Sequence, residues 1–234
     1  MPTYQTTGIV IGRTNFGEAD RVIRLFTAEH GKLSVVAKGV RRIKSRAAGH
    51  LEPFGEVNLT LTTGRGSLDV ITSARLQWYP HALTTDYARL ERAFTLTTRL
   101  DRLTEPGESH PKVYRALDTL LRELDTGPGT ALLELWYTLQ LLNALGYRPE
   151  LGQCLLCGYN QPDRAYYFDA TRGGLVCERD TTPGPPAMSI PAIKLWRLMS
   201  DHPYEQIRQL QNGPELANLT KPLADAFLTY HAIG

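Results

Sequence analysis

The residues of this chain best suited to holding a metal ion are three cysteines and an aspartate in its second half. Cys154 and Cys157 form a Cys-x-x-Cys pair, nineteen residues separate it from Cys177, and Asp180 follows at the position of a fourth ligand. This spacing matches a zinc template in which two such pairs supply four ligands. Because zinc accepts a carboxylate oxygen as well as thiolates, these four residues predict one structural Zn²⁺ per chain. The alternative is three free, buried thiols, with Asp180 an ordinary loop residue.

A second group of residues suited to chemistry is a cluster of cations in the first third of the chain. No acidic residue lies between His30 and Leu51, where the cations are Lys32, Lys38, Arg41, Arg42, Lys44 and Arg46. Residues 1–80 hold 11 Lys and Arg against 6 Asp and Glu, a net charge of +5, whereas residues 81–234 hold 15 against 18, a net charge of −3. This asymmetry indicates a polyanionic partner, and we expect the six cations to contact a phosphate backbone. The alternative is a solvated face that only maintains solubility.

Five segments with strand-like patterns surround the basic cluster. The clearest is Gly55–Thr62, in which Val57, Leu59 and Leu61 alternate with polar residues, as in a strand with one buried face. Three strands, a long connection and a final hairpin predict a five-stranded Greek-key barrel of the OB type, whose loops and one sheet face bind oligonucleotides. The predicted strands are Thr6–Arg13, Asp20–Thr27, Lys32–Lys38, Gly55–Thr62 and Ser67–Leu76.

The long connection, Gly39–Phe54, carries most of the basic cluster and several small residues. We expect it to be a mobile arm that follows an irregular phosphate backbone without reading a base sequence. Aromatic side chains near it in sequence are candidates for stacking on bases, as in proteins that bind single strands. These candidates are Tyr4, Phe16, Phe26 and Phe54. For Phe26 and Phe54, burial preferences favour a position in the core instead.

After Pro80 the apolar period changes from two to 3.6 residues, which indicates helices. The predicted helices are Leu83–Leu103, Val113–Leu124, Leu132–Leu145, Ile190–Asp201 and Pro214–His231. Trp136 and Trp196 are predicted to lie in the core of this part. The predicted fold class is therefore α+β, with an OB-type barrel over residues 1–80 and a helical bundle over residues 81–234. A zinc-binding insert over residues 151–182 interrupts the bundle.

Composition and motifs argue against several classes of protein. No apolar run approaches the ~20 residues that span a bilayer, and no signal peptide is visible. Three cysteines make a disulfide framework unexpected and favour a reducing cytoplasm. The chain has no Walker A loop, no His-Glu-x-x-His helix and no Gly-x-Ser-x-Gly elbow, and its cysteine order differs from that of zinc deaminases, so an enzyme is not expected. An OB-fold RNA-binding protein and a zinc-dependent hydrolase remain as alternatives.

Several short segments are distinctive in their order and spacing, namely Gly8–Ile11, Gly17–Arg21, Gly31–Arg42, Leu51–Phe54, Gly146–Pro149 and Gly173–Cys177. By these segments the chain resembles the RecO family of bacterial recombination mediators over essentially its full length. Members have an N-terminal OB domain, a helical C-terminal domain and, in many cases, a four-cysteine zinc module. This chain departs from that pattern at Asp180, where such members carry the fourth cysteine.

The resemblance implies a non-enzymatic protein of DNA repair and recombination, cytoplasmic and associated with the nucleoid. It implies binding of single- and double-stranded DNA and annealing of complementary strands. It further implies that the protein, with RecR, helps to load recombinase onto single strands coated by single-strand-binding protein. On this interpretation, the six cations of the basic cluster contact the phosphates of DNA.

Overall fold

The structure is a computed structural model that describes residues 2–43, 45, 47–64, 68–127, 129–181 and 184–233. The chain divides into two compact units, Met1–Gly127 and Pro128–Gly234, and each is considered by itself. The first unit contains the barrel together with the helices up to Gly127. The domain boundary expected near residue 80 stays a prediction.

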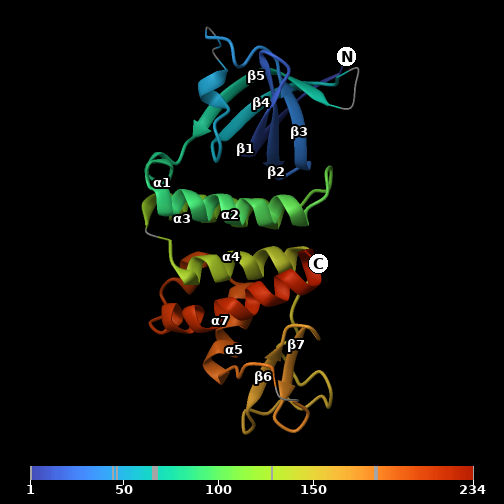
Figure 1. The fold of residues 1–234 in the computed structure, drawn as a ribbon, viewed down its shortest axis with the longest axis vertical. Coiled ribbons are helices and arrows are strands. Elements are labelled where there is room, and N and C mark those ends of the chain that lie inside the picture. The colour runs from blue at the N-terminus through green and yellow to red at the C-terminus, as the bar shows by residue number, and fades with distance from the viewer. Residues whose placement is uncertain are drawn as a thin grey trace. The chain divides into compact units, whose positions relative to one another are not determined.

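The first unit begins with a closed barrel of five strands, drawn from blue to blue-green in Figure 1. The strands are β1 (Thr3–Phe16), β2 (Asp20–Thr27), β3 (Gly31–Ala37), β4 (Glu56–Thr62) and β5 (Asp69–Trp78). Their order is β1-β2-β3-β5-β4, with β3 and β5 parallel and the other neighbours antiparallel. The long strand β1 closes the barrel, because its first half pairs with β4 and its second half with β2. The predicted OB-type barrel is confirmed.

The alternating pattern of β4 produces the barrel core. Val57, Leu59 and Leu61 are at most 2% exposed and pack into one apolar cluster with residues of β1, β2 and β3. Phe26 and Phe54 are fully buried, so the core position is confirmed for both. The short 3₁₀ helix at Ala48–His50 lies in the long connection before Phe54.

Phe54 has an unusual backbone conformation, with φ at +69°. Its amide N donates to the carbonyl of Val10 (2.8 Å), and the ring contacts that of Phe94 edge to face, with 4.8 Å between centroids. A left-handed φ is rare for a bulky residue, so the surrounding packing must hold it in place. Phe54 thus joins the end of the long connection to the helical layer of the first unit.

In the described part of the first unit, the barrel is followed by helices α1 (His81–Thr85), α2 (Tyr87–Leu103) and α3 (Pro111–Thr126). The prediction of one continuous helix over Leu83–Leu103 was wrong. The backbone is extended at Asp86, and its side chain caps α2 by accepting a hydrogen bond from the amide of Arg89 (3.1 Å). The apolar spacing from which this helix was predicted includes Tyr87 and Phe94, yet these two side chains are 80% and 43% exposed.

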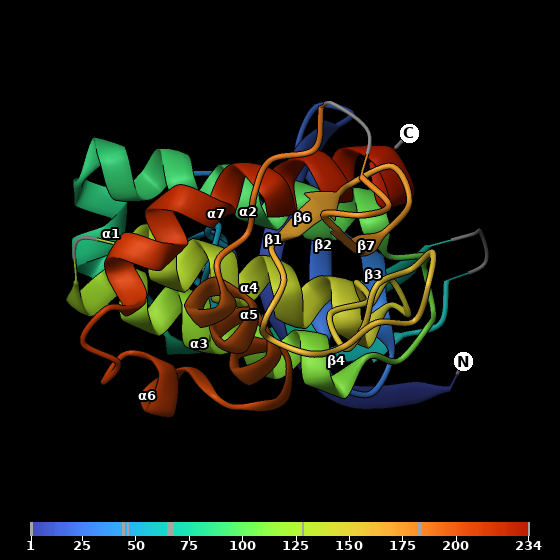
Figure 2. The ribbon, with the colours of Figure 1, turned by 90° about the horizontal axis from the view of Figure 1, so that it is seen from below.

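The second unit packs helices α4 (Ala131–Ala144), α5 (Ile190–Asp201) and α7 (Gly213–Leu228) against one another, as Figure 2 shows. A short helix α6 (Tyr204–Ile207), which was not predicted, and a π-helical turn at Thr229–Ile233 complete the helical part. Trp136 and Trp196 are 3% and 0% exposed, which confirms their core positions. A two-stranded sheet, β6 (Tyr166–Asp169) and β7 (Gly174–Cys177), lies between α4 and α5 in the sequence. Among the described residues, no helix is long and apolar enough to cross a membrane.

Candidate metal centre and nucleic-acid surface

Two loops and the end of a strand bring the candidate metal ligands together. Cys154 and Cys157 lie in the loop after α4, which turns at Gly158 with φ at +73°. The amide of Leu155 donates to the carbonyl of Leu175 (2.8 Å), which holds this loop against β7. Cys177 ends β7, and Asp180 stands in the turn that follows. The β6–β7 hairpin therefore presents one half of the site to the loop that presents the other half.

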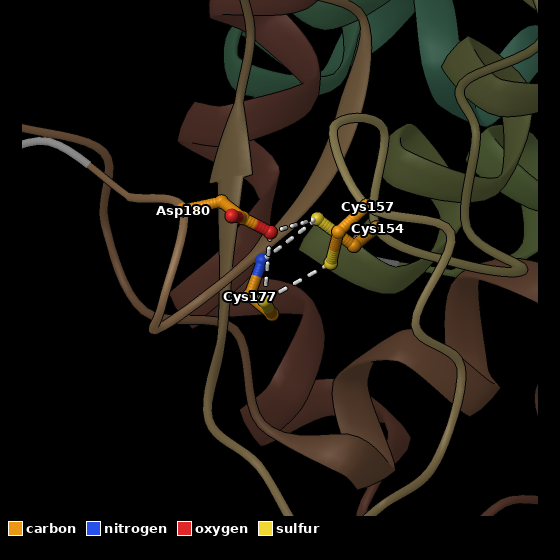
Figure 3. A group of neighbouring side chains, drawn as sticks. All are labelled: Cys154, Cys157, Cys177 and Asp180. Carbon is orange, nitrogen blue, oxygen red and sulfur yellow. Dashed lines mark hydrogen bonds between the residues drawn. The ribbon is translucent and has the colours of Figure 1, made fainter.

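Figure 3 shows the four side chains converging on one point. All four potential ligand atoms lie within 4.8 Å of one another. The Asp180 Oδ2 atom is 3.3 Å from the Cys154 Sγ and 3.1 Å from the Cys177 Sγ, and the Cys157 Sγ is 3.7 Å from the Cys177 Sγ. Two thiolates at the usual Zn–S distance on a tetrahedral ion would be about 3.8 Å apart. The donor set and its spacing fit a closed four-ligand metal site.

The pKa values of three of these groups, Cys154, Cys157 and Asp180, are shifted by their contacts. Burial raises the pKa of the Cys154 thiol, but backbone hydrogen bonds from Cys157, Cys177 and Leu156 outweigh it, and the net shift is downward. Hydrogen bonds from the thiols, that of Cys157 foremost, lower the pKa of Asp180, and the same contact raises the pKa of Cys157 to about 12. A divalent cation would take the place of the shared protons, so its binding would release them.

One cation stands beside this anionic group. The guanidinium carbon of Arg164 lies 3.4 Å from the centroid of the Tyr159 ring, and the side chain hydrogen-bonds to Cys177. Three thiolates and a carboxylate would leave a divalent metal site with a net charge of −2, which a neighbouring arginine offsets. Sequence reasoning missed Arg164, because only the folded loop places it beside Cys177.

The start of the arm is fixed to the hairpin that joins β1 and β2. The backbone amide of Arg41 donates to the carbonyl of Ala19 (2.9 Å), and its guanidinium donates to the carbonyl of Gly17 (3.2 Å). The amide of Gly39 donates to the carboxylate of Asp20 (2.7 Å). These three hydrogen bonds place the arm beside the hairpin tip, a juxtaposition that sequence reasoning missed.

We refer to Asn15–Arg21 and Lys38–Ile43 together as the hairpin–arm surface. Val40 is 2% exposed and anchors the arm to the barrel core. Lys38 and Arg42 are exposed, and neither side chain has an ion-pair or hydrogen-bond partner among the described residues. Their charges are therefore available to an anionic ligand.

The other predicted cations have different surroundings. The Lys32 Nζ donates to the carbonyl of Asp101 (2.6 Å) and lies 3.4 Å from its carboxylate, and the side chain is 15% exposed. A phosphate contact from Lys32 would require this pair to break. Lys44 and Arg46 lie outside the described residues. Of the six predicted cations, the structure brings three together on the hairpin–arm surface, namely Lys38, Arg41 and Arg42.

Comparison with known proteins gives a consistent result along the chain. The family model for the recombination protein O N terminal matches residues 1–78, and that for its C terminal matches residues 84–232. A DNA repair protein RecO of Roseiflexus sp. is 34% identical over 233 residues, which cover 97% of this chain and 80% of the relative. The DNA repair protein RecO of Bifidobacterium animalis subsp. lactis is also 34% identical, over 95% of this chain and 89% of the relative.

Proposed function

Since the chain belongs to the RecO family of DNA repair proteins, we propose that it binds DNA through the hairpin–arm surface and acts as a recombination mediator. The observation that carries the proposal is the exposure of Lys38 and Arg42, which have no partners among the described residues. They flank Arg41 in the sequence, and Arg41 is hydrogen-bonded to the β1–β2 hairpin of an OB-type barrel. Cations on an OB barrel meet phosphates without reading base sequence. The proposed ligands are single- and double-stranded DNA.

Annealing of complementary strands follows from the same electrostatics. Two single strands repel each other as polyanions, so a protein that neutralises phosphates and leaves the base edges free lowers the barrier to their association. No nucleotide hydrolysis is needed for this step. The cations of the hairpin–arm surface would neutralise phosphates, and Watson–Crick pairing would select the complementary strand.

We further propose two protein partners, RecR and single-strand-binding protein, with which this protein would help to load recombinase onto coated single strands. The family assignment supports this proposal, and the net charge of −3 on residues 81–234 leaves that part without an excess of cations to compete for DNA. A cytoplasmic protein associated with the nucleoid is the corresponding proposal for its location. Pull-down of each purified partner in turn, with and without single-stranded DNA, tests these contacts.

We propose zinc as the metal at Cys154, Cys157, Cys177 and Asp180, in a structural role. Four protein ligands would fill a tetrahedral ion, whereas catalytic zinc keeps one position open for water or substrate. The ion would hold the loop after α4 to the end of β7, which fixes the β6–β7 hairpin. The proposal is therefore a binding protein with a structural metal rather than a zinc-dependent hydrolase.

Annealing of complementary oligonucleotides, one labelled with a fluorophore and the other with a quencher, tests the proposed function. We expect the triple substitution of Lys38, Arg41 and Arg42 by Gln to slow annealing at least severalfold. A matched control replaces three exposed cations elsewhere, Lys112, Arg115 and Lys194, and changes the net charge equally. Equal rates for the two triple variants would contradict the assignment to the hairpin–arm surface.

An RNA ligand is the alternative that the same surface allows. Phosphate contacts and base stacking can form with either DNA or RNA. Lysine and arginine side chains do not by themselves distinguish RNA by its 2′-hydroxyl. Competition between matched DNA and RNA strands for the wild-type protein distinguishes the two. Tighter binding of DNA supports the proposal, and a strong preference for RNA would contradict it.

A further inference from the structure

We propose that Phe16, at the tip of the β1–β2 hairpin, stacks on an unpaired base, so that the hairpin–arm surface holds single-stranded DNA by a base as well as by its phosphates. The inference rests on the proposed DNA binding and goes beyond it, because it assigns the preference for strand type to one side chain. An aromatic ring offers a base a flat apolar face without reading its identity.

Exposure separates Phe16 from the other aromatic candidates near the arm. Phe26 and Phe54 are fully buried in the first unit, and Tyr4 is half-buried and donates its hydroxyl to the carboxylate of Asp69 (2.7 Å). Phe16 is 53% exposed, although exposing a phenyl ring to water is unfavourable. Among these four rings, only Phe16 can receive a base without rearrangement of the barrel.

Strand register places Phe16 near the free cations. Phe16 is paired with Asp20 on β2, and the next residue of β2, Arg21, is paired with Ala37 on β3, directly before Lys38. Two strand spacings therefore separate the backbones of Phe16 and Lys38, a distance of about 10 Å. A base on Phe16 would leave neighbouring phosphates within reach of Lys38 and Arg42.

The hairpin tip is built to present this ring. Gly17 follows Phe16 and has φ at +59°, a conformation that glycine adopts easily and that the tight turn requires. Its carbonyl accepts a hydrogen bond from the guanidinium of Arg41 (3.2 Å). The only free acid in the turn is Glu18, which is exposed and would repel a phosphate placed directly over it. A single strand stacked on Phe16 would be repelled by the carboxylate of Glu18 and attracted by the cations of Lys38 and Arg42.

Stacking of this kind favours single strands over duplex. Inside a duplex both faces of each base are already covered, and extruding a base breaks its pairing and its stacking. An unpaired base has a free face, so it gains the stacking contact at little cost. The phosphate contacts, in contrast, are common to both strand types.

Binding of a fluorescently labelled single strand and of a duplex of equal length to the full-length protein tests the inference. We expect Phe16→Ala to weaken single-strand binding by about 5- to 150-fold, the range for loss of one base–aromatic stack, and to change duplex binding less than twofold. Phe16→Trp should restore single-strand binding. Tyr87→Ala, which removes another exposed aromatic side chain of the first unit, should leave both affinities unchanged.

A second measurement reports the stack directly. Photocrosslinking of a strand that contains 5-iodouracil, which reacts with an aromatic ring stacked on it, should label the peptide that contains Phe16. Equal loss of single-strand and duplex binding in Phe16→Ala, unchanged single-strand binding, or labelling confined to other peptides would each overturn the inference. If the arm triple variant loses affinity while Phe16→Ala does not, the proposed function stands and this inference fails. If neither variant loses affinity, the proposed site on the hairpin–arm surface fails as well.

Discussion

The number of phosphates that the hairpin–arm surface contacts can be read from the salt dependence of binding. Each phosphate contact on a single strand contributes about 0.7 to the magnitude of the slope of log K against log salt. The structure places Lys38, Arg41 and Arg42 there beside Arg21, whose guanidinium already donates to the side chain of Asn15 (3.3 Å). Replacing Lys38, Arg41 and Arg42 by Gln should therefore lower this magnitude by about 2. The assay is equilibrium binding of a labelled oligothymidylate at several salt concentrations, with the melting temperature measured in parallel.

Lys32 supplies the internal control for this prediction. Its ammonium is held by the carbonyl and carboxylate of Asp101 in a half-buried position, so it is not expected to contribute to the slope. Lys32→Gln should instead lower the free energy of unfolding by about 1–3 kcal/mol, because it removes a charged hydrogen bond. An unchanged salt slope in the triple variant, at an unchanged melting temperature, would show that the three cations are only solvated by water and do not contact DNA. A smaller magnitude of the salt slope in Lys32→Gln would show that Lys32 contacts a phosphate, and it would refute its assignment to the pair with Asp101.

Two further predictions concern the metal site and the barrel. Wild-type protein kept reduced and free of chelator should hold about one zinc per chain. Asp180→Cys should slow the release of zinc to a chromogenic chelator, because thiolate is a softer ligand for zinc than carboxylate, and Asp180→Ala should speed the release, because it removes one ligand. Absence of zinc from the wild type and from both variants would contradict this prediction. Phe54→Ala should lower the free energy of unfolding of the first unit by about 3–5 kcal/mol, as for other fully buried phenylalanines. Urea denaturation followed by a barrel-specific signal measures this loss, and a change below about 1 kcal/mol would show that Phe54 does not anchor the long connection.

Local patterns predicted most of the barrel and the whole candidate metal set. The alternation of Val57, Leu59 and Leu61 fixes which face of β4 is buried, and that depends only on neighbouring residues. The four metal ligands could be predicted because their spacing in the sequence is short enough for one loop and one hairpin to bring them together. Although Asp180 stands where a four-cysteine site has its fourth cysteine, the four ligand atoms lie within 4.8 Å of one another.

Features that depend on contacts between distant segments could not be predicted in this way. Lys32 lies inside an acid-free stretch of sequence, yet its partner Asp101 is 69 residues further along the chain. The break between α1 and α2 did have a local signal, because Asp86 is a good N-cap residue, but the apolar period continues across it and concealed the break. The contact between Arg41 and the β1–β2 hairpin likewise depends on the closed barrel.

On the proposed function, DNA binds to the hairpin–arm surface of the first unit. Hydrogen exchange of the full-length wild-type protein, measured with and without a saturating oligothymidylate, tests it without any substitution. Slower exchange is expected in the peptides that cover Asn15–Arg21 and Lys38–Ile43, with little change in α4, α5 and α7. Protection confined to the second unit, with none in those two segments, would contradict the claim.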